Sequence, residues 1–248
     1  MFTSIITVYS LIMPRKIIIK PLCTIFEQKD ARNIFDNTWP MDAGTEITPN
    51  LLQAMVHSGA YLSGAYVDNK CVGAAFAFPA TTEGLHLHSH MTAVLDKYRD
   101  QGIGYALKLD QWHWAKKNNY EEITWTFDPL VARNAKLNLI KLSVEISAYY
   151  PNFYGEMPDA LNAGDESDRV MASWKVVGDQ PVAKSVITNP EKSDTLIKIP
   201  EDIVAIRSED ISENLKWRRK VRDEFMRAFE KGGKVVGFSA NNEYVVRI

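Results

Sequence analysis

The segment RDQGIGYAL, residues 99–107, decides how this sequence is interpreted. It follows LHLHSHMTAVL (85–95), which is typical of a strand, and it opens a segment of helical composition at 102–117. Gly102 and Gly104 carry no side chains, so main-chain N–H groups at the helix start can approach an anion, and the helix dipole favours negative charge there. The turn predicts either a pyrophosphate cradle or a purely structural glycine pair. The third glycine of the dinucleotide-binding pattern is missing, and so is a Walker A motif.

The composition is that of an ordinary globular protein. Of 248 residues, 46% are hydrophobic and 24% are charged, which excludes a disordered, collagen-like or coiled-coil chain. Basic residues number 29 and acidic residues 31, so the net charge of -2 gives no general attraction to phosphate backbones or anionic lipid. We therefore expect no nucleic acid and no membrane among its partners.

Two cysteines, Cys23 and Cys71, both occur in apolar stretches. We expect buried thiols there, not a disulfide, a thiolate zinc site or a catalytic nucleophile. The apolar residues 1–14 have no basic n-region and no cleavage site, and they are too short to span a bilayer. We expect a cytoplasmic protein in which residues 1–16 form an N-terminal extension; a signal anchor is the alternative.

The order of elements favours a mixed α/β sheet with helices on both faces. An antiparallel start leads into an alternation of strands and helices: strand 17–23, helices 26–39 and 49–57, hairpin strands 61–67 and 71–78, strand 85–95, helix 102–117, strand 121–127, helix 132–142 and strand 146–150. Residues 156–194 are predicted as a loop-rich connection with one strand at 169–176. Residues 195–248 are predicted as an α+β unit with a strand near Ile197 and a helix at 212–230.

A basic segment, KWRRKVR, occupies residues 216–222. On a helix, Trp217, Val221, Phe225 and Ala228 share one apolar face, which predicts that the basic side chains lie on the opposite, solvated face. A site for a partner or an anion is the alternative.

The segment AVLDKYRDQGIGYAL, residues 93–107, resembles the coenzyme A signature of the GNAT N-acyltransferase superfamily, an R/Q-x-x-G-x-G/A turn after the fourth strand. A narrower resemblance, to a GNAT subgroup of predicted acetyltransferases, rests on LHSHM (87–91), RDQGIGYALKLDQ (99–111), ITWTFDPLVARNAKLNLIKL (123–142) and NFYG (152–155). The implied fold is a GNAT-like central mixed sheet flanked by helices over residues 17–155. The C-terminal α+β appendage at 195–248 would cover either the acceptor cleft or a subunit interface of a homodimer.

The resemblance implies that acetyl-CoA or another acyl-CoA lies where the fourth and fifth strands separate, and no metal is expected. The pantetheine arm would pair with the main chain of Met91, Thr92, Ala93 and Val94. The diphosphate would lie on the turn formed by Arg99, Asp100, Gln101, Gly102, Ile103, Gly104 and Tyr105. Asn134 is similar in position to residues that contact the pantetheine, or it is a polar residue at a helix start.

Three alternating histidines, His86, His88 and His90, share one face of a regular strand. They form a metal site, or they are polar residues at the mouth of the sheet, or they contact substrate, with His88 or His90 as general base. Asp128 follows the fifth strand, where open α/β sheets place their ligands. It either holds the acceptor amine or is a turn aspartate before a proline.

Many GNAT enzymes carry a tyrosine acid on the helix after the fifth strand, and this sequence has Leu139 there. The remaining candidates are Tyr149, Tyr150 and Tyr154, of which Tyr154 is our choice; the alternative is that all three are core aromatics.

We therefore expect an N-acyltransferase that moves an acetyl or other short acyl group, succinyl among them, from a CoA thioester to an amine. The acceptor would be a small molecule such as an amino acid, attacked directly in a ternary complex. The missing helix tyrosine favours one alternative, a non-catalytic acyl-CoA-binding or regulatory module on the same fold. The histidines favour another, a metallohydrolase.

Overall fold

A seven-stranded mixed sheet forms the centre of the computed structural model, which describes residues 16–41, 47–82, 84–157, 159, 162–181 and 186–248. The sheet has the order β1-β2-β3-β4-β5-β7-β6. In that order the strands are Ile18–Pro21, Tyr61–Val67, Lys70–Ala80, His86–Val94, Glu122–Phe127, Arg169–Lys175 and Glu145–Tyr150. β4 and β5 are parallel, and the other neighbours are antiparallel. The expected mixed α/β class is confirmed. The predicted extension, apart from Lys16, lies outside the described residues.

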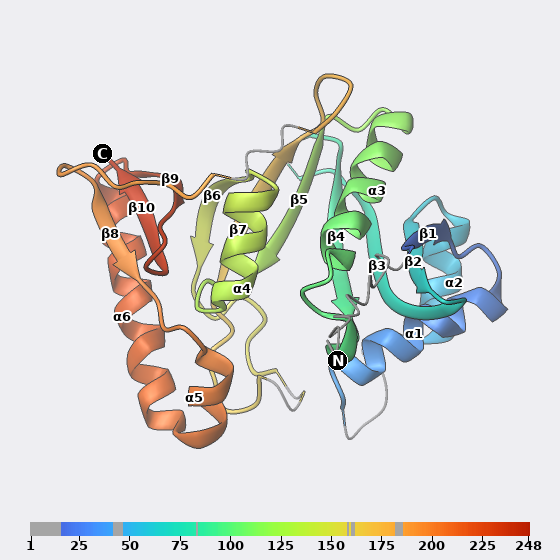
Figure 1. Ribbon diagram of the computed structural model, residues 1–248, viewed down its shortest axis with the longest axis horizontal. Coiled ribbons are helices and arrows are strands. Elements are labelled where there is room, and N and C mark those ends of the chain that lie inside the picture. The colour runs from blue at the N-terminus through green and yellow to red at the C-terminus, as the bar shows by residue number, and fades with distance from the viewer. Residues whose placement is uncertain (1–15, 42–46, 83, 158, 160–161, 182–185) are drawn as a thin grey trace, which may run out of the picture.

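Helices cover both faces of this sheet (Figure 1). α1 (Ile25–Thr38) and α2 (Pro49–His57) pack on one face, against apolar residues of β2, β3 and β4. α3 (Ile103–Lys117) and α4 (Ala132–Ala135) pack on the other face, and a π-helical segment, η2 (Lys136–Lys141), continues α4. The helix starts follow from local capping, because Thr24 forms a capping box with Glu27 and the Thr48 hydroxyl accepts the N–H of Leu51.

A β-bulge at His90 changes which face β4 presents to each layer of helices. Ser89 and Met91, on either side of it, pair with consecutive residues of β3, so His90 is the extra residue. Before the bulge, Leu87 packs in the cluster that includes α3; after it, Met91 packs in the cluster with α1 and α2. Because β4 lies between β3 and β5 in the sheet order, this bulge is in the centre of the sheet and not at an edge.

The C-terminal segment folds as a smaller α+β unit beside β6 (Figure 1). It comprises β8 (Thr195–Lys198), α5 (Ile203–Glu209), α6 (Ile211–Glu230), β9 (Lys234–Phe238) and β10 (Glu243–Arg247), with the sheet order β8-β10-β9. The ring of Phe225 on α6 lies 5.2 Å from that of Tyr149 on β6, and the Tyr244 hydroxyl donates to the Pro129 carbonyl at 2.8 Å. The unit is therefore joined to the main sheet by buried contacts. Helix α5 was not anticipated from the sequence.

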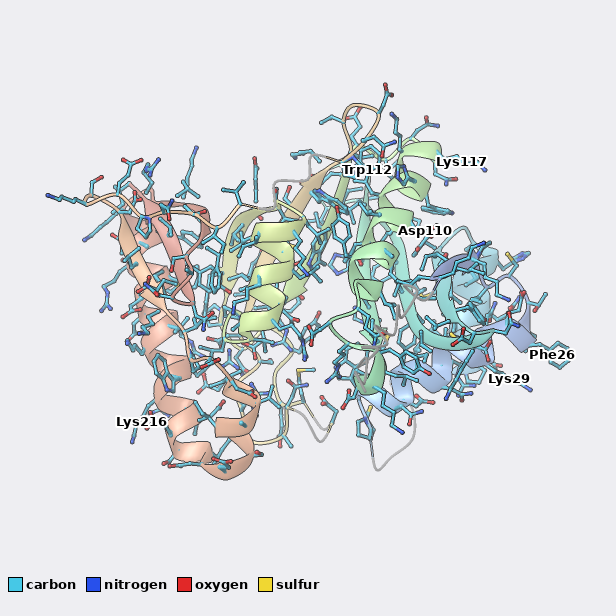
Figure 2. All side chains as sticks on the ribbon, in the orientation of Figure 1. Phe26, Lys29, Asp110, Trp112, Lys117 and Lys216 are labelled. Atoms are coloured by element: carbon cyan, nitrogen blue, oxygen red, sulfur yellow. The ribbon has the colours of Figure 1, made fainter. Side chains whose placement is uncertain are left out.

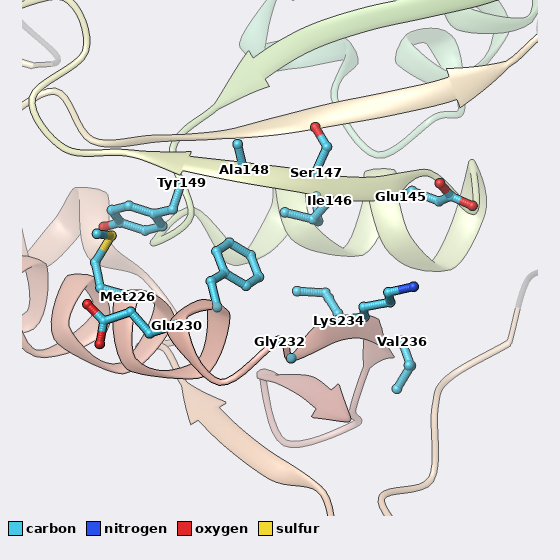
Figure 3. Close-up of a pocket in the computed structure, with 13 residues that line it drawn as sticks. Glu145, Ile146, Ser147, Ala148, Tyr149, Met226, Glu230, Gly232, Lys234 and Val236 are labelled. Atoms are coloured by element: carbon cyan, nitrogen blue, oxygen red, sulfur yellow. The ribbon is translucent and has the colours of Figure 1, made fainter. Parts of the chain in front are cut away.

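A groove of about 750 Å³ lies between β6, the end of α6 and β9. Figure 3 shows Tyr149 and Met226 at one end of it and Lys234 at the other. In the sheet order, β5 and β7 lie between this groove and β4. None of the helices in the described part of the chain combines the length and apolarity needed to cross a bilayer.

Two expectations about exposure were wrong. The basic side chains of α6 are not all solvated: Arg218 is 1% exposed and Arg222 is half-buried, because both pair with carboxylates of the segment before β7. Lys216, by contrast, points away from the molecule (Figure 2). Cys23 is exposed and Cys71 only half-buried, since Cys23 lies just before the start of α1 and not within a buried strand.

Candidate functional site

The parallel strands β4 and β5 are joined at only one end. Their register pairs are Leu87 with Ile123 and His88 with Thr124, and beyond these the strands diverge (Figure 1). From Met91 to Val94, β4 still pairs with β3. The main-chain groups on its other side therefore point toward the space beside β5, where an extended ligand can bond to them.

The glycine turn continues from this open end of β4, after the short 3-10 segment η1 (Asp96–Tyr98). Gly102 is the N-cap of α3 with a left-handed φ of 81°, and no side chain caps the helix. The first intrahelical bond runs from the Ala106 N–H to the Gly102 carbonyl, so three N–H groups of the first turn have no acceptor within the helix. A Cβ on Gly102 would meet nothing within 4 Å, and one on Gly104 would touch only Val94 at 3.9 Å. The helix start is thus open and rich in donors, which fits a diphosphate.

Arg99 flanks the same turn, and its guanidinium pairs with Asp96 at 2.6 Å. Asp100 also has a left-handed φ, of 60°. On the other side of the β4–β5 separation, Asn134 lies half-buried in α4, and its main-chain N–H donates to the Val131 carbonyl. Arg99 and Asp100 thus follow the end of β4, and Asn134 follows the end of β5, so the segments assigned to coenzyme A from the sequence both follow the open end of the separation.

His88 lies at the point where β4 and β5 part. Its Nδ1 is 3.1 Å from the Thr124 hydroxyl, and its ring lies 5.3 Å from that of Phe78. Burial, followed by the neighbouring charges of His90, His86 and Lys108, lowers the pKa of His88 to about 4. The imidazole is therefore neutral at physiological pH and able to accept a proton.

Tyr154 lies on the same face of the sheet as His88. Its hydroxyl is 3.0 Å from that of Thr126, and β5 alternates so that Thr124 and Thr126 share the face opposite its buried apolar residues. His90 is exposed near the same place, with its ring 5.9 Å from that of Phe78. Sequence reasoning missed the two threonines, although their alternation in ITWTF was a usable signal.

Asp128 belongs to a different group of side chains. It is 8% exposed and accepts two hydrogen bonds from Arg218, at 2.7 and 2.8 Å, and one from Arg207 at 3.1 Å. Despite burial, these arginines hold the pKa of Asp128 well below its usual range. Its carboxylate links the end of β5 to helices α5 and α6 of the appendage.

The other two tyrosine candidates are placed differently from Tyr154. Tyr149 is buried, and its hydroxyl donates to Asp168 at 2.5 Å, which together with burial raises its pKa far above the usual value. Tyr150 is 37% exposed and packs on Phe153. Among the described residues, the hydrogen-bond partners of the Thr124 and Thr126 hydroxyls are His88 and Tyr154, and not Tyr149 or Tyr150.

A buried lysine lies behind the β4–β5 junction. Lys108 of α3 is 4% exposed; its Nζ donates to Ser89 of β4 at 2.8 Å and lies 3.6 Å from the ring centre of Trp125 on β5. A third contact is to Gln111 at 3.2 Å. Burial lowers the pKa of Lys108 to about 7. This side chain connects the helix to both diverging strands.

The histidines do not converge on one point. His86 Nδ1 lies 2.8 Å from the Gly84 carbonyl, and the rings of His88 and His90 are 6.4 Å apart. Within the described ranges, no group of three or more His, Cys, Asp or Glu residues has the arrangement of a metal site.

Residues 28–137 match the model of the acetyltransferase (GNAT) family. This segment is a GNAT acetyltransferase domain. The GNAT domain includes the glycine turn, His88, Thr124 and Asn134, and its match ends inside η2, so the appendage lies outside it. The resemblance inferred from residues 93–107 is confirmed.

Solved structures share the fold of this GNAT domain. Arabidopsis thaliana Naa50 in complex with the bisubstrate analogue CoA-Ac-MVNAL is 18% identical, with a TM-score of 0.52 over 63% of this chain and 97% of that one. Ard1 from Thermoplasma volcanium is 15% identical, with a TM-score of 0.50 over 65% and 99%. An aminoglycoside 6'-N-acetyltransferase complexed with coenzyme A is 14% identical, with a TM-score of 0.50 over 65% and 98%. A search of curated proteins gives no match.

Proposed function

We propose that this protein is a CoA-dependent N-acyltransferase that transfers acetyl or another short acyl group to the amine of a small molecule. One observation carries the proposal: the separation of β4 and β5 leads directly into an uncapped glycine turn at the start of α3. A pantetheine arm needs main-chain partners along an open strand, and a diphosphate needs free N–H donors, and the two features adjoin. Structures of this fold crystallised with coenzyme A support the same ligand.

In this proposal the pantetheine arm pairs with β4 along Met91, Thr92, Ala93 and Val94. The Thr92 hydroxyl is buried without a hydrogen-bond partner in the structure, which fits a polar group that a ligand satisfies. The diphosphate lies on residues 99–105, and Asn134 contacts the arm from α4. The reacting thioester then lies close to the bulge at His90.

We assign His88 as the general base. In the tautomer whose Nδ1–H donates to Thr124, Nε2 carries the lone pair and takes the proton from the attacking amine. The amine nitrogen forms a bond to the thioester carbon, and the carbon–sulfur bond breaks. His90, exposed at the bulge, contacts the acceptor.

We assign Tyr154 as the acid that gives its proton to the departing thiolate, because it is held on the same face by Thr126. Asp128 is left out of the catalytic set, since its carboxylate is already bonded to two arginines. Its role in the proposal is to anchor the appendage.

The experiment is calorimetric titration with acetyl-CoA, succinyl-CoA and free CoA. Gly104→Glu places a carboxylate beside the diphosphate and should abolish binding, whereas Gly104→Ala, whose Cβ has room, is the matched control. Equal affinity for CoA in both variants would show that the glycine turn is not part of the binding site. The thioester that binds more tightly than free CoA identifies the donor.

A non-catalytic acyl-CoA-binding module is the second candidate, favoured by the buried Leu139 at the position of the usual helix tyrosine. It predicts CoA binding without thiol release over any panel of small amines. Thiol release that depends on an added amine excludes it.

A further inference from the structure

Arg169 is placed on the candidate catalytic face by its position at the start of β7. Val170 and Ala172 point into the core cluster, so Arg169 and Met171 point to the opposite face of the strand. Met171 pairs with Thr126 of β5, which continues this face to the site. The guanidinium carbon of Arg169 lies 5.2 Å from the centre of the Tyr154 ring.

The hydrogen-bond partners of this guanidinium are weak for a buried cation. The side chain is 8% exposed; Nη1 donates to the main-chain carbonyl of Asp168 at 2.8 Å, and Nη2 to the sulfur of Met157 at 3.1 Å. A thioether is a weak acceptor. No carboxylate within the described residues pairs with Arg169.

The neighbouring arginines are different in this respect. Arg218 and Arg222 bond directly to carboxylates, which raise the pKa of each guanidinium, whereas burial lowers the pKa of Arg169. Asp128 offsets part of this cost through space, but its oxygens are taken by Arg207 and Arg218. A buried guanidinium whose terminal nitrogens bond only to a main-chain carbonyl and a thioether is suited to bind a planar anion.

We infer that Arg169 binds a carboxylate of the substrate, which replaces the Met157 sulfur as the acceptor for Nη2. The inference rests on the proposed function, because the carboxylate belongs either to the acceptor amine or to the acyl group.

The two threonines of β5 relate the proposed carboxylate site to the proposed base. His88 contacts Thr124, and Tyr154, with Arg169 on its ring, contacts Thr126. Two residues along a strand span about 7 Å. The amine at His88 and the carboxylate at Arg169 therefore lie on one face of the sheet, and they belong either to one acceptor molecule or to an amine and a dicarboxylic acyl group that meet there.

The test compares substrates with and without a carboxylate in Arg169→Gln, Arg169→Lys and wild type. The acceptor pairs are phenylalanine with 2-phenylethylamine, leucine with isopentylamine, and lysine with 1,5-diaminopentane; the donors are acetyl-CoA and succinyl-CoA. Arg219→Gln, an exposed arginine on α6, is the control. Thermal unfolding of each variant accompanies the assays.

If the carboxylate belongs to the acceptor, Arg169→Gln should lower kcat/KM about 100-fold for each amino acid and less than threefold for the matching amine. Arg169→Lys should give an intermediate loss. An acyl carboxylate predicts the same selective loss with succinyl-CoA and not with acetyl-CoA. Equal losses for all substrates would mean a structural role and overturn the inference.

A binding measurement separates this inference from the proposed function. Calorimetric titration of the same pairs, and of both thioesters, compares wild type with Arg169→Gln in the absence of turnover. A carboxylate-dependent affinity that Arg169→Gln removes supports the inference even if no acyl transfer occurs. The inference is contradicted if the affinity is the same with and without the carboxylate, or if none of the probes binds.

Discussion

The Nδ1 atom of His88 on β4 and the Thr124 hydroxyl on β5 lie 3.1 Å apart, across the last register pair before the two strands separate. The proposed base is therefore fixed at the closed end of the separation by the parallel pairing of β4 with β5. A change in the angle between β4 and β5 would therefore change the distance between His88 Nδ1 and the Thr124 hydroxyl.

His88 should titrate well below an ordinary histidine, with a pKa of about 4, which NMR of the imidazole resonances can measure. Because the unfolded chain binds its proton near pH 6.5, it holds more protons than the folded chain between these values. The stability that His88 contributes is thus present above pH 6.5 and is lost as the pH falls through about 4. In His88→Gln this part of the pH dependence should disappear, and His86→Gln is the control. A His88 pKa of 6.5 or higher would refute the neutral-base assignment.

Tyr154→Phe removes the proposed acid and leaves the ring contacts in place. General acid catalysis contributes about 100-fold or more, so kcat should fall by that order while the affinity for acetyl-CoA is unchanged. Thr126→Val, which removes the hydroxyl partner 3.0 Å away, should give a smaller loss. Tyr150→Phe is the matched control on the same chain segment. An unchanged kcat in Tyr154→Phe would assign the acid elsewhere.

Lys108→Met should make the fold more stable near neutral pH and flatten its pH dependence. With a folded-state pKa of about 7 against 10.5 in the unfolded chain, the unfolded state binds more protons between these values. Wild-type stability should therefore rise with pH above 7, by about 1.4 kcal/mol per unit, and Lys108→Met should lack this rise. Urea denaturation at pH 7 and pH 8.5 measures both slopes. Parallel slopes would show that Lys108 is not a buried titrating group.

Arg218→Met should destabilise the protein by about 3–5 kcal/mol, since it leaves Asp128 and Asp165 buried with less compensating charge. The double variant with Asp128→Leu should recover part of the loss, because fewer uncompensated charges remain. Arg219→Met, on the exposed side of α6, should change stability by less than about 0.5 kcal/mol. Urea denaturation is the measurement, and a loss below 1 kcal/mol in Arg218→Met would contradict a stabilising role for this ion-pair cluster.

Much of the architecture was predictable from local sequence. The expected hairpin of β2 and β3 forms around Asp68 and Asn69, and the expected helix α2 begins after the cap residue Thr48, because both signals act over a few residues. Gly102 indicated a turn from the sequence because a glycine adopts a left-handed φ easily, and in the structure it has such a φ at the start of α3. The order of strands and helices followed from hydrophobic periodicity, because the spacing of apolar residues differs between a strand and a helix that each bury one side.

The arrangement around the site depended on contacts between distant segments. β7 pairs between β5 and β6, although it follows both in the sequence, and this places Arg169 beside Tyr154. The helical pattern of 216–222 suggested solvated arginines, because a single helix cannot show that carboxylates from residues 128 and 165–168 pack against it. The burial of these arginines depends on another segment that supplies carboxylates to pair with them. The periodicity of the helix contains no information about that other segment.

The sequence by itself therefore determined the mixed α/β class, the glycine turn and the catalytic candidates on β4, because each depends on neighbours within one strand, turn or helix. Only the tertiary structure decided that His88 meets Thr124, that Tyr154 meets Thr126, and that Asp128 belongs to the appendage contact. These pairings join residues 28 to 90 positions apart, and they form only when strand order and the packing of the appendage bring distant side chains within hydrogen-bond distance.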